Sequence, residues 1–293
     1  ARTAPPKRRE LPVPPLPEAD CTAEAPRLTI SVTRLEQLSP ALLELGCPAR
    51  VYIPLEEVSR LESLPGEGPE WCAVLPRVWR DRDEPALRTL LERARALGFT
   101  GVLIGNLGHL PLVRGLNFHL YGDYGLNVFN SRSLAYLKDK ELESACVSFE
   151  LRFAQIRDLK KVLRAEAIVY GRLPLMITEN CLVQNETGCR LDRQGPCVPE
   201  DGPCRCGQPN VLVDRTGAAF PLLPAYGHRT EIQNSKPLYL ADRPEHRRLG
   251  LAYARLRFTT ETAEECVSVV QNYLDAAPAA GDFTRGLYER GVE

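Results

Sequence analysis

The sequence lacks the features that would assign it to a membrane or to a general nucleic-acid-binding class. No apolar run approaches the ~18–20 residues that a membrane-spanning helix requires, so we expect no membrane partner. The 37 Lys and Arg residues are balanced by 38 Asp and Glu residues, giving a net charge of −1. This balance provides no overall basic footprint for nucleic acid.

Motifs of several enzyme classes are also missing. The sequence contains no dinucleotide fingerprint, no Gly-rich phosphate loop, no Gly-x-Ser-x-Gly elbow and no His-Glu-x-x-His pair. It therefore offers no recognisable hydrolase machinery.

The start of the chain has no initiator methionine and no signal-peptide pattern. The first residue is Ala1 and the only methionine is Met176. We therefore expect an excerpt of a longer, cytoplasmic protein. Residues 1–26 are rich in proline among charges, which is typical of a semi-rigid linker.

From residue 27 onward, short apolar runs alternate with amphipathic segments, which predicts parallel strands joined by helices. The clearest helix begins after Asp83, has Pro85 in its first turn and ends at Gly98. Eight strands are expected, at residues 28–32, 50–53, 72–75, 102–104, 118–120, 146–149, 168–170 and 253–258. The prediction is one α/β domain over residues 27–293, a (β/α)8 barrel of the TIM type.

Residues 174–242 interrupt the alternation between the seventh and eighth strands. A connection of this length is usually functional, and we expect it to lack regular structure. It leaves the end of the barrel at which active sites are built.

Ten cysteines are present, and five of them fall within 26 residues of this insertion. These are Cys181, Cys189, Cys197, Cys204 and Cys206. One dense cluster in a long α/β chain indicates metal binding, although disulfides and free thiols remain open. Thiolates suit both iron–sulfur clusters and zinc, and the spacing alone does not decide between them. His228 lies in the same insertion and is a further candidate ligand.

Polar residues also follow the predicted strands at the same end of the barrel. Among them are Asp123, Asn127 and Arg172. Singly, each is best explained as a helix cap or a loop hydrogen bond. Together they lie where barrel enzymes bind substrate. Arg172 and Arg229 are suited to bind a carboxylate or phosphate.

Five strings resemble those of the collagenase-like U32 peptidase family, and they occur in the expected order. They are Tyr170-Gly171-Arg172-Leu173-Pro174-Leu175-Met176 running into Glu179-Asn180-Cys181, Gly122-Asp123-Tyr124-Gly125-Leu126-Asn127-Val128-Phe129-Asn130, Asp214-Arg215-Thr216-Gly217, Asn234-Ser235-Lys236-Pro237-Leu238-Tyr239-Leu240-Ala241-Asp242 and Phe283-Thr284-Arg285-Gly286. The chain is most similar to the C-terminal barrel of long members, which implies an upstream family barrel in the same protein.

The resemblance implies a 4Fe-4S cluster, with zinc as the lesser alternative. Cys181 matches a ligand position, and Cys204 and Cys206 match a Cys-x-Cys pair. Relatives often carry the fourth cysteine where this chain has His228. The fourth ligand is therefore open among Cys189, which we favour, His228 and Cys197.

Family members of known activity resemble oxygen-independent hydroxylases that act on an RNA base, in rRNA or tRNA, or on the ubiquinone ring, with prephenate as the oxygen source. For this chain the resemblance implies a prephenate-linked hydroxylase, and we expect RNA as its substrate. Asp123, Asn127 and Arg172 would then line the site for this anionic small molecule. Two other functions are kept: a peptidase, as the family name states, and a non-catalytic metal-stabilised barrel that supports the upstream catalytic domain.

The placement of the cysteines predicts different consequences for two substitutions. Cys181 directly follows the seventh strand, so the barrel should fix its position. Cys197 stands between Gly195-Pro196 and Val198-Pro199 in what resembles an insertion. We expect Cys181→Ser to abolish the visible absorbance and iron content of anaerobically prepared protein, and Cys197→Ser to retain both. An unaltered cluster in Cys181→Ser would overturn the ligand assignment.

Overall fold

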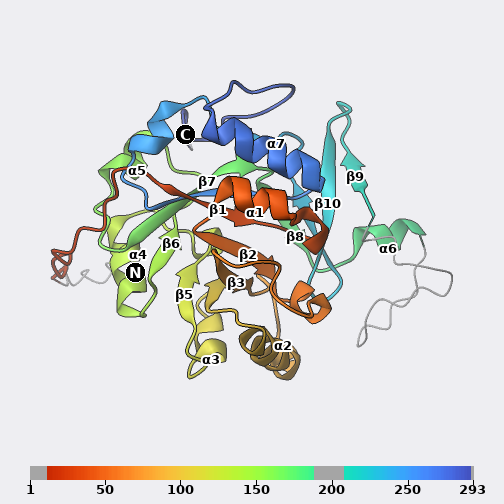
Figure 1. Ribbon diagram of the computed structural model, residues 1–293, viewed down its shortest axis with the longest axis horizontal. Helices are drawn as coiled ribbons and strands as arrows, with labels where there is room; N and C mark the ends of the chain where they lie inside the picture. Colours follow the sequence, from red (N-terminus) through yellow and green to blue (C-terminus); the bar gives the residue numbers. More distant parts are fainter. Residues whose placement is uncertain (1–11, 188–207, 292–293) are drawn as a thin grey trace, which may run out of the picture.

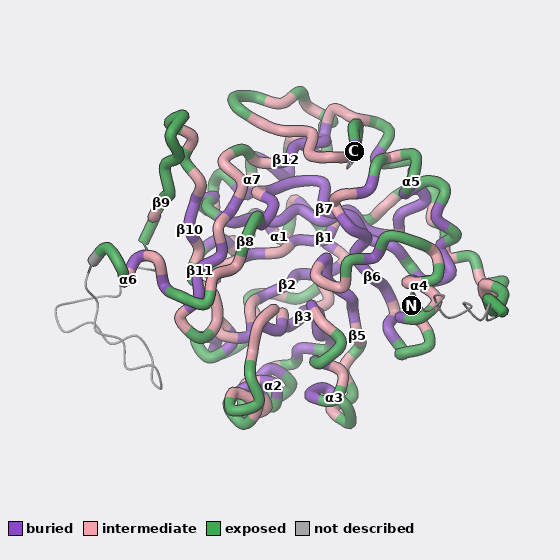
Figure 2. Tube along the Cα trace, turned by 180° about the vertical axis from the view of Figure 1, so that it is seen from behind, coloured by how far each residue is buried: buried purple, intermediate pink, exposed green. Residues whose placement is uncertain are grey.

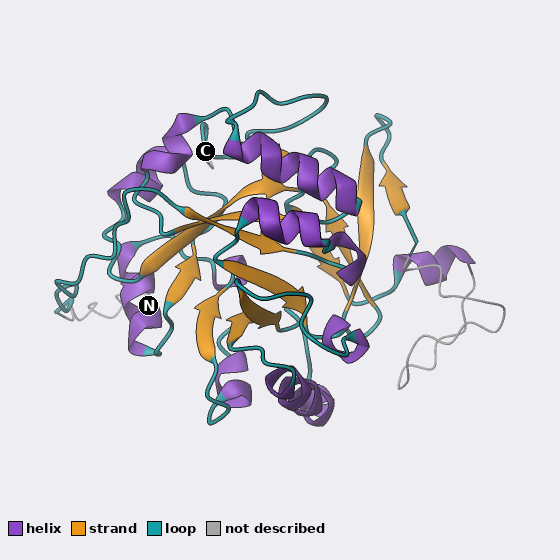
Figure 3. Ribbon diagram, viewed as in Figure 1, coloured by secondary structure: helices purple, strands orange, loops and turns teal. Residues whose placement is uncertain are grey.

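The computed structural model of the chain describes residues 12–187 and 208–291 and contains a closed barrel of eight parallel strands (Figures 1 and 3). The barrel order is β7-β13-β1-β2-β3-β4-β5-β6, and β6 pairs with β7 to close the ring. The strands are β1 (Arg27–Ser31), β2 (Arg50–Pro54), β3 (Glu70–Val74), β4 (Gly101–Ile104), β5 (His119–Gly122), β6 (Ser144–Cys146), β7 (Arg164–Gly171) and β13 (Tyr253–Arg257). The predicted fold class is confirmed.

Several strand bounds differ from the prediction: β7 begins at Arg164, four residues before the predicted start, and β3, β5 and β6 differ by about two residues. The sequence predicted 118–120 for β5 and 146–149 for β6, whereas the strands run over His119–Gly122 and Ser144–Cys146. In β6, the ladder uses the small residues Ser144 and Ala145, which pair with β5 and β7. The more apolar Val147 that follows is buried just beyond the ladder: it makes an isolated bridge to Val128, and its amide donates to the Glu166 carbonyl at 2.8 Å.

All helices except α6, which follows β8 beside the cap, surround the barrel (Figure 1). They are α1 (Pro40–Gly46), α2 (Glu84–Ala96), α3 (His109–Val113), α4 (Ser131–Asp139), α5 (Phe153–Asp158), α6 (Leu182–Thr187) and α7 (Ala263–Leu274). In α2 the buried residues Leu87, Leu91 and Ala94 lie on one face, at helical spacing. In α7, Thr262 and Glu265 form a reciprocal capping box.

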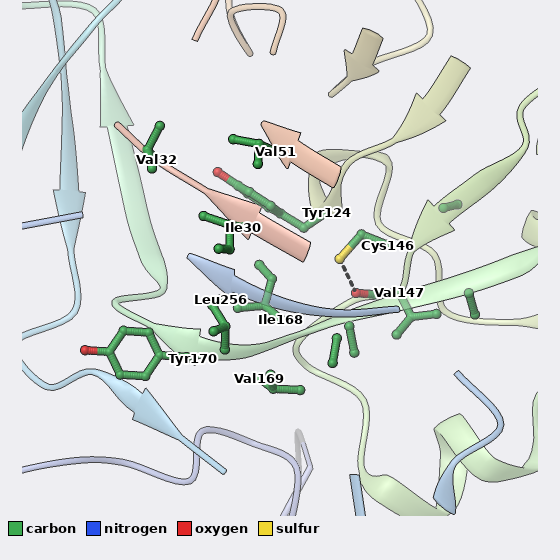
Figure 4. Close-up of a cluster of buried hydrophobic side chains, with 14 of the residues drawn as sticks. Ile30, Val32, Val51, Tyr124, Cys146, Val147, Ile168, Val169, Tyr170 and Leu256 are labelled. Atoms are coloured by element: carbon green, nitrogen blue, oxygen red, sulfur yellow. Dashed lines mark hydrogen bonds between the residues drawn. The ribbon is translucent and has the colours of Figure 1, made fainter. Parts of the chain in front are cut away.

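Side chains of each barrel strand alternate between the helical layer and the barrel interior. Ile30, Val51 and Leu256, from the three neighbouring strands β1, β2 and β13, belong to the apolar cluster between barrel and helices (Figure 4). Residues that precede them by one position, such as Thr29 and Arg255, face inward and both bond to Glu166. The buried trace through the barrel strands is shown in Figure 2. The interior is therefore a packed core that includes polar side chains.

The expectation of an irregular insertion is wrong for the described residues. Between β7 and β13 the chain forms a second, antiparallel sheet in the order β8-β11-β10-β9, which we call the cap. Its strands are β8 (Pro174–Thr178), β9 (Asn210–Val213), β10 (Ala219–Ala225) and β11 (Arg229–Gln233). The chain then returns through β12 (Leu238–Tyr239), which pairs antiparallel with β7. Figure 1 shows the cap beside the barrel.

The described part of the proline-rich start lies against the barrel before β1 begins. The Cys21 amide donates to the Lys161 carbonyl at 2.6 Å, and Arg132 donates to the Pro14 carbonyl at 2.5 Å. The division into a linker at 1–26 and a barrel domain at 27–293 stays a prediction. Among the described residues, no helix has the length and apolar character needed to cross a membrane.

The junction between β7 and the cap predicts a strict requirement for glycine. Gly171 has a φ of +117°, and a Cβ there would lie 2.0 Å from the Arg257 carbonyl oxygen. We expect Gly171→Ala to lower the free energy of unfolding by about 3 kcal/mol or more, because neither backbone can yield without breaking the β7–β13 ladder. Gly217 has a φ of +85°, and a Cβ at that position would meet nothing within 4 Å, so Gly217→Ala should cost only about 1–2 kcal/mol. Urea unfolding of both variants tests this, and equal losses would contradict it.

Candidate functional site

The carboxyl ends of the barrel strands, with the loops that follow them, form the mouth of the barrel. The three predicted substrate-binding residues lie near this mouth, but they do not form one group. Asp123 follows β5, is buried, and its Oδ1 lies 2.5 Å from Arg255 Nη1. Arg172 follows β7 and donates to the backbone carbonyls of Asn234 and Ser235. Asn127 follows the short turn after β5 and has a φ of 51°. Two of the three therefore already bind groups of the chain itself.

Inside the barrel, a fully buried arginine joins two carboxylates. Arg255 on β13 donates to Asp123 and, through its other terminal nitrogen, to Glu166 on β7. Glu166 also accepts from Thr29 Oγ1 at 2.6 Å and from the Tyr52 hydroxyl at 3.2 Å. Although burial opposes the charge, the two carboxylates raise the pKa of Arg255. This network fixes the relative positions of five barrel strands or their ends.

A second network closes the mouth against β11 of the cap. Glu231 Oε1 lies 2.9 Å from Arg77 Nη1 and 3.5 Å from the Tyr124 hydroxyl. Its Oε2 accepts from Arg257 Nη2 at 3.1 Å and from Gln233 Nε2 at 2.9 Å. All four donors converge on one carboxylate that the cap supplies.

The charges of these two networks cancel. Three arginines, Arg77, Arg255 and Arg257, face three carboxylates, those of Asp123, Glu166 and Glu231. A buried charge is tolerated only when it is paired. In this closed arrangement, each of the three guanidinium groups is therefore already compensated by a carboxylate of the chain.

His109 connects the two loops that follow β3 and β4 at the mouth. The Gly105 amide lies 3.1 Å from its Nδ1, and its Nε2 lies 3.1 Å from the Pro76 carbonyl oxygen. This arrangement requires the neutral tautomer with the proton on Nε2. Burial lowers the pKa of His109 to about 4, which keeps the ring neutral at pH 7.

Cys181 stands between the end of β8 at Thr178 and the start of α6 at Leu182, and β8 pairs with β11 of the cap. Two contacts hold the chain on either side of Cys181. Thr178 pairs with Thr230 in the β8–β11 ladder, and the Leu182 amide donates to Thr230 Oγ1 at 3.0 Å. Cys181 is 7% exposed. His228 stands in the turn directly before β11, with a φ of 61°. The structure thus brings two separate strings of the sequence, around Cys181 and around His228, to one corner of the cap.

Arg229 holds this corner together. Its Nη2 lies 3.0 Å from Glu179 Oε2, and its Nη1 donates to the Tyr226 carbonyl at 3.0 Å. Hydrogen bonds from Arg229 and then Arg80 lower the pKa of the Glu179 carboxyl. The sequence predicted that Arg229 could bind a carboxylate, and the carboxylate it binds is that of Glu179.

The remaining candidate ligands, Cys189, Cys197, Cys204 and Cys206, lie outside the described residues. Within the described ranges, no three His, Cys, Asp or Glu side chains are grouped in a way that could hold a metal ion. Cys181 and His228 are the two candidate ligands that the structure places. As soft and borderline donors, a thiolate and an imidazole fit an iron–sulfur centre or zinc.

Most residues of the two networks could not be identified from the sequence. Arg255 and Arg257 alternate with apolar residues in the run Tyr253-Ala254-Arg255-Leu256-Arg257-Phe258. Alternation places both arginines on the same side of the strand, facing the interior. This alternation with a period of two was the sequence signal that could have identified Arg255 and Arg257 as interior residues. Arg77, Glu166 and Glu231 had no comparable signal, because each is a single charge whose partner is distant in the sequence.

Comparison with known proteins gives one family and a set of distant structures. The model of peptidase family U32 matches residues 64–209. No curated protein sequence matches the chain. The solved structure of the U32 peptidase Mk0906 has a TM-score of 0.43 at 8% identity, covering 88% of this chain and 100% of that one.

Two further structures show similarly low values. A tryptophan synthase α-subunit from Pyrococcus furiosus has a TM-score of 0.35 at 10% identity and covers 51% of this chain and 78% of its own. A putative deoxyribose-phosphate aldolase from Coccidioides immitis has a TM-score of 0.32 at 12% identity, over 52% and 78%. Neither bears on function.

The environment of His109 predicts a loss of stability in acid. A histidine titrates near pH 6.5 when unfolded, whereas burial lowers its pKa to about 4 in the fold. The stabilisation is therefore complete above pH 6.5 and is lost as the pH falls from 6.5 to 4, by about 3 kcal/mol. Urea unfolding across this range should show that His109→Gln removes this component.

His119 serves as a control, because its contribution to stability should change with pH in the opposite direction to that of His109. It is exposed, and its hydrogen bond with Glu143 raises its pKa. Its small contribution is present at low pH and is lost as the pH rises. An unchanged acid profile in His109→Gln would contradict the prediction.

Proposed function

This chain belongs to peptidase family U32, and on that premise we propose that it is the iron–sulfur-binding domain of a prephenate-linked, oxygen-independent hydroxylase that modifies an RNA base. The observation that carries the proposal is the position of Cys181. It is held by the β8–β11 ladder at the entrance to the segment that contains the other four clustered cysteines. A ligand fixed by the scaffold lowers the entropic cost of closing the rest of the segment on a metal.

The ligands of the proposed 4Fe-4S cluster are Cys181, Cys189, Cys204 and Cys206. His228 and Cys197 are the alternatives for the fourth position. The pairing of β8 with β11, and the bond from the Leu182 amide to Thr230, bring the string around His228 to the string around Cys181, which supports His228 as a ligand. When bound, the cluster would supply electron transfer, since iron–sulfur centres span a wide range of reduction potentials. Zinc is the lesser alternative.

For the small anion, the proposal retains Asp123, Asn127 and Arg172 at the mouth. Asp123 would position Arg255, and Arg172 would hold the segment after β11. Both would then act on the ligand through their neighbours. RNA would be contacted by the full-length protein, together with the upstream family barrel, because this chain has no excess of positive charge.

A second function is favoured by one observation, the cancelled charges at the mouth. A barrel in which Arg77, Arg255 and Arg257 are paired with carboxylates of the chain itself is suited to support a catalytic neighbour. In this alternative the cluster stabilises the cap, and the upstream barrel does the chemistry. The peptidase named by the family is a third possibility, tested by gelatin degradation against a metal-free control.

The cluster is tested by metal analysis. We expect the chain, purified without oxygen, to contain about four irons and matching sulfide, with the brown colour of a thiolate-ligated cluster. Stoichiometric zinc without sulfide would overturn the proposal. The iron-free protein should keep its barrel but be cleaved faster between Cys181 and Cys206, because thiolate bonds would no longer order that segment.

The division of labour is tested on the longer protein. Hydroxylation of RNA is compared with and without this domain, and then with Cys181→Ser. If Cys181→Ser loses the reaction while retaining RNA binding and the upstream barrel, the cluster takes part in the chemistry. If the reaction persists without the cluster, the supporting function is correct.

A further inference from the structure

A partly apolar groove runs beside the first turns of α4. Its volume is about 670 Å³, which lies within the range of about 300–1,000 Å³ that is usual for ligand sites. Leu107 lines it from the loop after β4 and Leu126 from the short turn after β5, while α4 contributes Arg132, Tyr136 and Leu137. Because these elements follow the carboxyl ends of their strands, the groove lies at the mouth end of the barrel.

The groove exposes large apolar side chains. Leu107 is 45% exposed and Tyr136 is 47% exposed, whereas Leu126 is half-buried and Leu137 is buried. An apolar surface that leads from solvent to the core gains free energy when another apolar group covers it. An aromatic ring beside aliphatic side chains is also the kind of surface on which proline-rich segments dock.

The start of the chain passes directly beside this groove. The Cys21 amide donates to the Lys161 carbonyl after α5, and the Pro14 carbonyl accepts from Arg132 Nη1 at 2.5 Å. Figure 1 shows this part of the chain next to α5 and α4. Since Arg132 itself lines the groove, the residues that precede Pro14 are tethered next to it.

The tethered segment has a composition that suits the groove. Residues 1–17 contain six prolines, and proline-rich segments are extended with little conformational entropy left to lose on docking. Leu11 is the one large apolar residue among residues 1–11. An extended chain spans at most about 3.3–3.6 Å per residue, so Leu11 stays within about 10 Å of Pro14. Val13, by contrast, is 66% exposed and does not fill the groove.

We infer that the groove is the docking site of the chain's own proline-rich start, with Leu11 as the apolar group that covers Leu107 and Tyr136. The bond between Arg132 and Pro14 favours this occupant over a second copy of the chain, because it places the segment where that copy would have to dock.

Docking would fix the route of the segment over the barrel. Strand β1 begins at Arg27, at the end of the barrel opposite the mouth. A segment held in the groove therefore runs along the height of the barrel and brings the residues before Leu11 to the mouth end. This inference goes beyond the proposed function and does not depend on it.

The segment contains its own reporter, because Lys7, Arg8 and Arg9 provide trypsin sites shortly before Leu11. In the 293-residue chain, we expect Leu11→Ser and Tyr136→Ser each to raise the initial rate of cleavage at these sites roughly fivefold or more, because cleavage follows the fraction of the segment that is undocked. The rates are measured by mass spectrometry. Leu11→Ser leaves every groove residue in place, so the test does not depend on the folding of a groove variant.

Two matched controls replace exposed apolar residues that the inference leaves out. Val13→Ser changes the same segment, and Leu175→Ser changes a side chain on β8 that is 55% exposed. Both should be cleaved at residues 7–9 as slowly as the wild type.

A labelled peptide of residues 1–17 gives a second readout, by fluorescence anisotropy. It should bind the full Leu11→Ser chain at least about fivefold more tightly than the wild-type chain, because the wild-type groove is already occupied by its own segment. Adding Tyr136→Ser to the Leu11→Ser chain should abolish binding, and a peptide that carries Leu11→Ser should not bind.

Four outcomes would overturn the inference. They are equal cleavage rates in the wild type, Leu11→Ser and Tyr136→Ser; no binding of the peptide to the Leu11→Ser chain; peptide binding that Tyr136→Ser leaves unchanged; and self-association of the wild type, measured by sedimentation, that Tyr136→Ser abolishes. The last would assign the groove to a second copy of the chain.

Discussion

The buried guanidinium of Arg255 is the constraint on which the barrel depends. A charge inside a protein is costly unless it is paired, and here Asp123 and Glu166 compensate it through the two terminal nitrogens of the guanidinium. Glu166 in turn fixes Thr29 and Tyr52. The interior of the barrel is thus specified by directional bonds, which tolerate less rearrangement than apolar contacts do. Removing one partner would leave an uncompensated charge among its neighbours.

The same requirement extends from the interior to the cap. Arg257 lies two residues after Arg255, so it faces the same interior at the next level, where the barrel opens. The carboxylate that pairs with it comes from Glu231 of β11. The cap is therefore joined to the barrel through electrostatic pairing. This explains how a strand from a separate sheet is positioned at the mouth.

The sequence predicted the barrel well because apolar runs record which strands are buried. Strand β13 and helix α2 carry clear periodic patterns, and both were found. The cap was missed because β10 contains Pro221 and Pro224, which are typical of loops or strand edges, and because β11 is mostly polar.

The site was only partly predictable. Asp123 and Arg172 do lie near the mouth, because a residue that follows a barrel strand must emerge at that end. The residues that Asp123 and Arg172 contact could not be predicted. Arg172 contacts a carbonyl 62 residues away, and Asp123 contacts a guanidinium 132 residues away. No local pattern contains information about contacts over such separations.

The excursion that contains the cap begins and ends at neighbouring points. It leaves the barrel after Gly171, and its return strand β12 places Leu238 directly opposite Gly171 in the ladder. The β7–β12 pairing holds the two ends of this excursion together, whatever the length of the chain between them. Loop-closure entropy changes only slowly with length, so this junction can accept insertions and deletions at little cost to the barrel. Such a position allows evolution to vary the cysteine-containing segment as a separable module while the eight-stranded scaffold remains the same.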